Sequence, residues 1–278
     1  MSLLRKLYYS LSPSLRFVAR RIYYFPSDCL DSFTGKRDCM IPPKGMVFVG
    51  SGDFIERGND ILELLVKYTE LKPDASVLDI GCGIGRLAVP LTKFLNEKGS
   101  YDGFDIVKKG IEWCNKRIAP KYPNFRFLHV DLKNDLYNDK TEDEARCFIF
   151  PYKDDSFDCV VLTSVFTHMM PEDVDNYLNQ IMRVMRSGGK CLVTFFMVND
   201  DILKKMDRGE TNFVFKHSYG DYLLMDKNVK EANIAYEENY LQKLYDKYGL
   251  KKTAVYYGQW SNSDDFVSFQ DVVILSKP

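Results

Sequence analysis

The residues best suited to chemistry surround one glycine-rich turn. Residues 77–87, VLDIGCGIGRL, form an apolar run that contains Asp79 and breaks into glycines. Such a run predicts a buried strand turning sharply into a helix, and glycines at the turn let a ligand approach the backbone closely. Asp105 and Asp131 end two later apolar runs. A carboxylate there can accept hydrogen bonds from ribose hydroxyls or from the amino group of a base. The pattern predicts a nucleoside site.

The spacing of the glycines disfavours two common nucleotide sites. The dinucleotide fingerprint G-x-G-x-x-G needs a third glycine where this chain has Arg86. A phosphate-binding loop needs Gly-Lys followed by Ser or Thr, and this does not follow the turn. An NAD-dependent reductase is therefore the disfavoured alternative, and a nucleoside lying close to bare backbone is the preferred one.

A parallel sheet is needed to bring the turn and the acids together. Apolar runs and helical patterns alternate along the chain, with strands expected at 75–80, 100–105, 125–130, 157–163 and 190–198. Helices are expected at about 59–70, 85–97, 108–118, 172–186 and 235–248. Two closing strands, in 253–257 and 267–275, are joined by a short turn, so the last runs antiparallel. The predicted fold class is α/β, a Rossmann-like seven-stranded sheet, mostly parallel, with an antiparallel last strand. Ligands bind beyond the carboxyl ends of such strands.

Two segments lie outside this alternation. Residues 1–45 are expected to form a helical arm and linker, with residues 46–278 as the main domain. Apolar residues recur every three or four positions from Leu4 to Phe25, which predicts two short helices separated at Pro13 and ending near Pro26. The arm could close over the site, lie on an anionic membrane surface, or pack on the domain. Residues 199–234 are expected to be an insert, a candidate substrate lid.

Composition narrows the class of protein. The chain has 278 residues, of which 45% are hydrophobic and 28% charged, typical of one soluble globular domain with additions. Its seven cysteines are scattered and never spaced C-x-x-C, which argues against a zinc site and favours a reducing, cytoplasmic location. Residues 1–25 carry five basic residues and no acid. The rest is net acidic, so nucleic acid is not an expected partner.

Four motifs in this order resemble a known family. VLDIGCGIGRL, with the acids at 105 and 131, resembles the first motif and its partners in class I S-adenosylmethionine (SAM)-dependent methyltransferases. Residues 157–169 resemble the fourth-strand motif of that family. Residues 183–189, RVMRSGG, resemble its R-V-L-K-P-G-G, with serine in place of proline. The resemblance covers about residues 60–200 and the closing hairpin, and it implies SAM as the cofactor.

The resemblance also implies which residues hold the cofactor. It assigns the methionine part of SAM to Asp79 and the turn from Gly81 to Gly85, including Cys82 and Gly83, and the ribose to Asp105. Ile106 and Leu132 would lie beside the adenine, Asp131 at its amino group, and Ser164 just after the fourth strand. A plainer alternative has Asp79 and Asp105 bracing the loop or capping a helix.

The expected reaction is a methyl transfer that needs alignment more than acid–base chemistry. His168 is the candidate general base, and the alternative is that it braces its loop. Residues 163–166 lack the Asn/Asp-Pro-Pro-aromatic motif of DNA and amide N-methylators. A small-molecule acceptor is therefore expected, methylated on oxygen or nitrogen, such as a sugar or glycan precursor. Alternatives are an inactive SAM-binding scaffold and an enzyme for lipid-linked substrates at the membrane.

Overall fold

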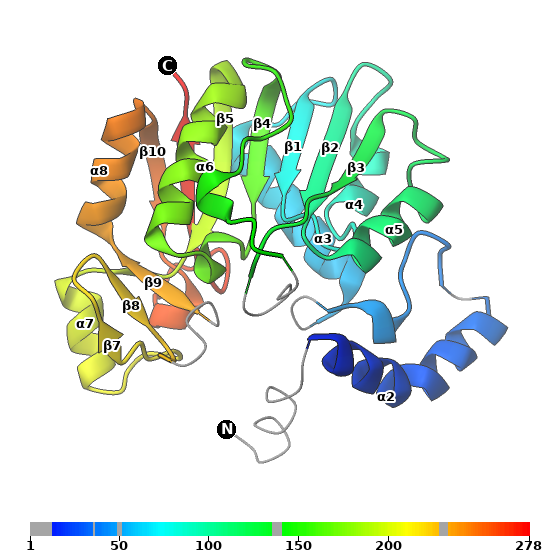
Figure 1. Cartoon of the computed structure of the whole chain (residues 1–278), viewed down its shortest axis with the longest axis horizontal. Coiled ribbons are helices and arrows are strands. Elements are labelled where there is room, and N and C mark those ends of the chain that lie inside the picture. Colours follow the sequence, from blue (N-terminus) through cyan, green and yellow to red (C-terminus); the bar gives the residue numbers. More distant parts are fainter. Residues whose placement is uncertain (1–12, 36, 49–51, 135–140, 228–232) are drawn as a thin grey trace.

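A seven-stranded sheet forms the centre of the computed structural model, which describes residues 13–35, 37–48, 52–134, 141–227 and 233–278 (Figure 1). The strand order is β10-β11-β5-β4-β1-β2-β3. The strands are β1 (Ser76–Ile80), β2 (Ser100–Asp105), β3 (Phe125–His129), β4 (Phe157–Leu162), β5 (Met185–Phe195), β10 (Lys251–Tyr256) and β11 (Asp271–Ser276). β1 pairs in parallel with β2 and β4, whereas β11 runs antiparallel to both β5 and β10. The predicted fold class is confirmed.

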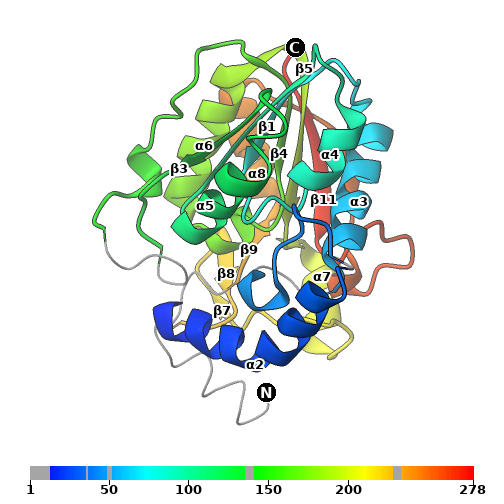
Figure 2. The same cartoon turned by 90° about the vertical axis from the view of Figure 1, so that its right-hand side faces the viewer.

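Helices cover both faces of this sheet (Figure 2). On one face, α3 (Phe54–Leu64), α4 (Ala88–Phe94) and α5 (Lys108–Arg117) share a core cluster with Val77. On the other, α6 (Pro171–Val184) and α8 (Glu238–Tyr248) pack with Leu78 and Ile80. Successive residues of β1 therefore point into opposite cores, which explains why the strand reads as a continuous apolar run.

Some element boundaries differ from the sequence prediction. The helix expected at 59–70 starts earlier, at Phe54, because the Asp53 carboxylate caps it by accepting hydrogen bonds from the backbone N–H groups of Ile55 and Glu56. It ends at Leu64 and continues as a π-helical turn, Leu65–Thr69. β5 begins at Met185, so the serine and glycines of residues 187–189 belong to the strand rather than to a loop.

The N-terminal arm contains one long helix in the described part, α2 (Pro13–Phe33). The first of the two predicted helices lies outside the described residues. The prediction that the second ends near Pro26 is wrong, because α2 continues through Pro26. The Asp28 carboxylate accepts hydrogen bonds from the backbone N–H groups of Lys44 and Gly45 at 2.7 and 3.0 Å. These contacts hold the turn beyond Pro26 against the 3-10 turn Lys44–Met46, offsetting the intrahelical bond that proline removes.

The segment predicted as an insert, 199–234, contributes to a second, smaller sheet that also includes residues just outside those bounds. Its strand order is β6-β9-β8-β7, from β6 (Met197–Val198), β7 (His217–Ser218), β8 (Tyr222–Leu224) and β9 (Ile234–Glu237). Helix α7 (Asp200–Asp207) packs beside it around Phe196 and Trp260. Among the described residues, no helix is both long and apolar enough to cross a bilayer.

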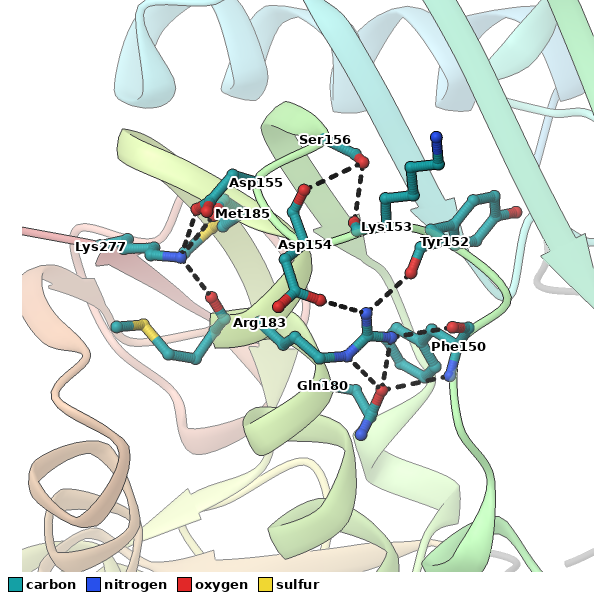
Figure 3. Close-up of polar contacts among 11 residues, drawn as sticks. Phe150, Tyr152, Lys153, Asp154, Asp155, Ser156, Gln180, Arg183, Met185 and Lys277 are labelled. Atoms are coloured by element: carbon teal, nitrogen blue, oxygen red, sulfur yellow. Dashed lines mark hydrogen bonds and ion pairs between the residues drawn. The ribbon is translucent and has the colours of Figure 1, made fainter.

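Arg183, the first residue of the predicted 183–189 motif, has a structural role. Its guanidinium donates to the carbonyls of Phe150 and Tyr152 and to the Asp154 carboxylate, each within 2.8 Å (Figure 3). Nearby, the Lys277 ammonium donates to the carbonyl of Met185 at 2.8 Å. These contacts tie the segment before β4 and the end of the chain to the last turn of α6.

Candidate functional site

The glycine turn after β1 adopts backbone angles that favour glycine. The φ angles of Gly81, Gly83 and Gly85 are +76°, +59° and +83°. A Cβ atom on Gly81 would lie 2.4 Å from Val165 Cγ2, and one on Gly85 would lie 2.9 Å from Cys114 Sγ. At these two positions the space is therefore taken by protein side chains. This packing differs from the sequence argument, which attributed the glycines to close approach of a ligand.

Asp105 joins the end of β2 to the glycine turn. Its Oδ2 accepts a hydrogen bond from the Gly83 N–H at 2.7 Å, and its Oδ1 accepts one from the Val107 N–H at 2.7 Å. The carboxyl group thus braces the turn, as in the plainer alternative. Each oxygen has a second lone pair for a ligand hydroxyl. Burial raises the pKa of Asp105 to about 6.

Asp79 lies behind the turn and is almost fully buried, with 3% of its surface exposed. Its carboxylate accepts a hydrogen bond from the Tyr101 hydroxyl at 2.7 Å. Burial, with a contribution from nearby Asp105, raises the pKa of Asp79 to about 7. Burial also raises the pKa of the Cys82 thiol well above its ordinary value. Cys82 is therefore a neutral packing residue at physiological pH.

Asp79 predicts a pH-dependent stability. Its folded-state pKa of about 7 exceeds the value of about 3.9 expected in the unfolded chain. The folded state binds more protons between these values, so its contribution to the free energy of unfolding falls as pH rises through this window. Between pH 5 and pH 8 we expect the free energy of unfolding of wild type to fall by about 2–3 kcal/mol more than that of Asp79→Asn. Urea unfolding across this range checks the difference, and parallel profiles for the two proteins would contradict it.

The residues assigned beside the base gather at the ends of β2 and β3. Ile106 and buried Leu132 both belong to the core on the same face of the sheet. Asp131 is exposed, two residues beyond β3. The ends of the two strands are linked because the Val130 N–H donates to the carbonyl of Asp105 at 3.1 Å. His129, whose Nε2 lies 3.2 Å from the carbonyl of Ile106, belongs to the same corner.

Ser164, just after β4, is held in a strained conformation. Its φ is +57°, which is uncommon for a residue with a side chain. The Ser164 N–H donates to Thr194 Oγ1 at 2.8 Å, and its hydroxyl donates to Gln270 Oε1 at 3.0 Å. The Thr194 hydroxyl also donates to Gln270 Oε1, at 2.7 Å. Sequence reasoning missed Thr194 and Gln270, which lie on distant segments and match no motif.

His168 ends the short 3-10 turn Phe166–His168 that follows Ser164. Its backbone N–H donates to the carbonyl of Val165 at 2.9 Å, and its own carbonyl accepts from Asn134 Nδ2 at 3.3 Å. The backbone is therefore fixed from both sides, and the residue is half-buried. Val165, between Ser164 and His168, is the residue that packs against Gly81. The structure thus joins the segment after β4 to the glycine turn.

Two described surface cavities lie away from the glycine turn. One, of about 390 Å³, is bordered by α6, α8 and the insert, and its lining includes Pro171, Tyr222 and Tyr240. The other, of about 430 Å³, lies at the amino ends of the strands and is lined by Ser76 and Ser100 among others. Because ligands of such sheets bind at the carboxyl ends, the turn and its acids identify the site better than cavity size does.

Comparison with known proteins gives the same family as the motifs. Residues 77–189 match the family described as "Methyltransferase domain". The tRNA N(3)-cytidine methyltransferase METTL2 of Gallus gallus is 28% identical over 125 residues, 42% of this chain and 29% of that protein. The ubiquinone/menaquinone biosynthesis C-methyltransferase UbiE of Wigglesworthia glossinidia brevipalpis is 27% identical over 133 residues, 48% of this chain and 47% of that protein. The matches therefore span less than half the length of either relative.

The fold also matches a solved structure. The 1,6-didemethyltoxoflavin-N1-methyltransferase of Burkholderia thailandensis, solved with 1,6-didemethyltoxoflavin and S-adenosylhomocysteine, superposes with a TM-score of 0.51. The superposition covers 96% of this chain and 91% of that chain at 15% identity, so it shows that the two chains share a fold. Together with the matched domain and the four motifs in order, it confirms the resemblance of residues 77–189 and of the fold to the class I SAM-dependent methyltransferases.

Proposed function

We propose that this protein transfers a methyl group from SAM to an oxygen or nitrogen of a small molecule. The observation that carries the proposal is the position of Asp105. Its carboxylate, at the carboxyl end of β2, accepts the Gly83 N–H and has lone pairs left for ligand hydroxyls. These acceptor oxygens therefore fit an adenosyl group next to the turn. A sugar or glycan precursor is one form of the proposed acceptor.

The proposed cofactor site follows the carboxyl edge of β1, β2 and β3. The methionine part would lie at Asp79 and the turn from Gly81 to Gly85, and the ribose at Asp105. The adenine would lie between Ile106 and Leu132, with its amino group toward Asp131. This placement is supported by the shared cluster of Ile106 and Leu132 and by the link between the ends of β2 and β3.

The proposed mechanism depends mainly on alignment. Bound SAM supplies an electrophilic methyl group, and its transfer is a direct displacement. Ser164 would border the reacting centre, and its hydrogen bonds to Thr194 and Gln270 hold that border in one geometry. The smaller sheet would form the acceptor side, because the Tyr236 hydroxyl in β9 donates to the carbonyl of Met169, next to His168.

His168 is the proposed general base for an acceptor that holds its proton at neutral pH. We expect His168→Ala to lower turnover by about a hundredfold, within the usual range for losing a general base, while SAM affinity changes less than about twofold. Initial rates with radiolabelled SAM between pH 6 and 9, paired with calorimetry, check this. An unchanged rate and pH profile for His168→Ala would leave His168 as a loop brace.

The proposal is tested first by binding and then by transfer. Calorimetry of the full chain should detect SAM and S-adenosylhomocysteine but not NADH, and failure to bind either adenosyl compound would refute the proposal. Methyl-labelled SAM is then incubated with soluble acceptors, quinones and tRNA, because UbiE is named for quinone biosynthesis and METTL2 for tRNA. SAM binding without labelled product from any pool would favour the inactive scaffold, and labelling of tRNA would contradict the small-molecule acceptor.

A further inference from the structure

Helix α2 turns an apolar side away from the protein. Besides Tyr23 (77%) and Leu30 (64%), five large apolar side chains on it are strongly exposed: Leu15 (53%), Val18 (49%), Ile22 (70%), Phe25 (66%) and Phe33 (90%). Their spacing of three, four or eight positions places them on one face of the helix. In an ordinary surface helix this face would be buried in the core. The same spacing continues upstream in the sequence to Leu11, Leu7 and Leu4.

Another side of α2 is fixed to the body by specific contacts, which determine its orientation. Asp28 accepts the backbone N–H groups of Lys44 and Gly45. The missing Cβ of Gly45 would lie 3.0 Å from the Cα of Arg21, so the two backbones are in close contact. Farther along, the Lys109 ammonium lies 3.9 Å from the centre of the Phe17 ring. The helix cannot rotate to bury its apolar side without breaking these contacts.

The place of α2 in the molecule suits a flat partner. In both views the helix lies crosswise beyond the carboxyl ends of the parallel strands (Figures 1 and 2). Its outward side therefore forms part of the outer boundary at that end of the molecule. A planar surface that met α2 would face the edge of the sheet that carries the glycine turn.

The charges of α2 indicate the chemistry of the partner. Its acids are engaged internally, with Asp28 3.6 Å from Arg37 and Asp31 3.3 Å from Lys44. Arg21 is exposed beside the apolar face, and the first 25 residues hold five basic residues and no acid. A second copy of this chain would bring like charges together. Anionic lipid headgroups match both the apolar face and the positive charge.

We propose that α2 docks the protein on an anionic lipid surface, with the five exposed apolar residues entering the interface and Arg21 contacting headgroups. The helix would lie in the plane of the interface, as amphipathic interfacial helices do. The inference does not depend on the proposed methyl transfer, because it uses only the orientation, exposure and charge of α2.

Sedimentation of the full chain with vesicles tests the docking. Wild type should bind phosphatidylcholine vesicles that contain phosphatidylglycerol, bind pure phosphatidylcholine at least about tenfold more weakly, and be released by salt. Ile22→Asp should weaken binding to the anionic vesicles at least about tenfold. Ile149→Asp is the matched control, because Ile149 is also 70% exposed but lies before β4, and it should bind like wild type.

Three results would overturn the docking. The first is that wild type does not bind the anionic vesicles, and the second is that Ile22→Asp binds them as well as wild type does. The third is that light scattering finds a dimer that Ile22→Asp dissociates, which would assign the face to a second copy of the chain. SAM affinity is measured on the same samples. Lost vesicle binding with unchanged SAM affinity in Ile22→Asp separates this inference from the proposed function.

Discussion

Replacing Asp105 by alanine is expected to weaken SAM binding by about a hundredfold or more in a protein that still folds. A charge-assisted hydrogen bond contributes about 1.5–3 kcal/mol, and two ribose hydroxyls would lose their acceptor. The variant also removes the acceptor of the Gly83 N–H, so the glycine turn loses its tie to β2. Because about 1.4 kcal/mol corresponds to a tenfold change in affinity, the combined loss should weaken SAM binding by more than about a hundredfold. Calorimetric titration with SAM measures it.

Asp102→Asn provides the matched control for this prediction. Asp102 lies in the same strand, is also buried, and pairs with Arg126 at 2.6 Å, but it lies three residues before the carboxyl end of β2. The control should lower the free energy of unfolding. Its SAM dissociation constant should stay within about threefold of the wild-type value, since an ion pair near the surface contributes little to a site elsewhere in the protein. If Asp105→Ala bound SAM like wild type while its far-ultraviolet dichroism stayed unchanged, the ribose would not lie at Asp105.

The parts of the site that the sequence predicted are those set by local patterns. An apolar run that ends in glycines defines both β1 and its turn, and an acid at the end of the next run places Asp105. Parallel pairing then brings these ends to one edge, so no long-range information is needed. The mostly parallel character of the sheet followed from the alternation of strands and helices, and its antiparallel last strand followed from the short final connection.

The parts that the sequence did not predict depend on contacts between distant segments. Gln270 lies 106 residues from Ser164, yet the two side chains are hydrogen-bonded. No periodicity marks a single glutamine before a strand, so only the folded chain shows its partners. The continuation of α2 beyond Pro26 has the same origin, because it rests on the contacts of Asp28 with the linker. Local rules would end the helix at the proline.

The second large effect is expected at Asp271, the first residue of β11. Its carboxylate is fully buried and accepts three hydrogen bonds, from the backbone N–H groups of Gly258 and Met197 at 2.6 Å and from Trp260 Nε1 at 2.8 Å. Met197 begins β6, so Asp271 joins the insert to the closing hairpin. Asp271→Ala leaves three buried donors without an acceptor, each costing about 1–3 kcal/mol. We expect the free energy of unfolding to fall by about 3–6 kcal/mol.

Two further variants show whether the loss of stability comes from losing the Asp271 carboxylate rather than from any substitution in this part of the chain. Asp271→Asn keeps the shape and one oxygen but turns an amide N–H₂ toward a donor. It should therefore lower the free energy of unfolding by about half as much as Asp271→Ala does. Asp265→Ala, at an exposed position in the preceding turn, should change the free energy of unfolding by less than about 0.5 kcal/mol. Urea unfolding of the three variants gives the ranking directly. A loss below about 1 kcal/mol for Asp271→Ala would mean that water or a shifted backbone replaces the carboxylate, and the insert would then be held mainly by packing around Trp260.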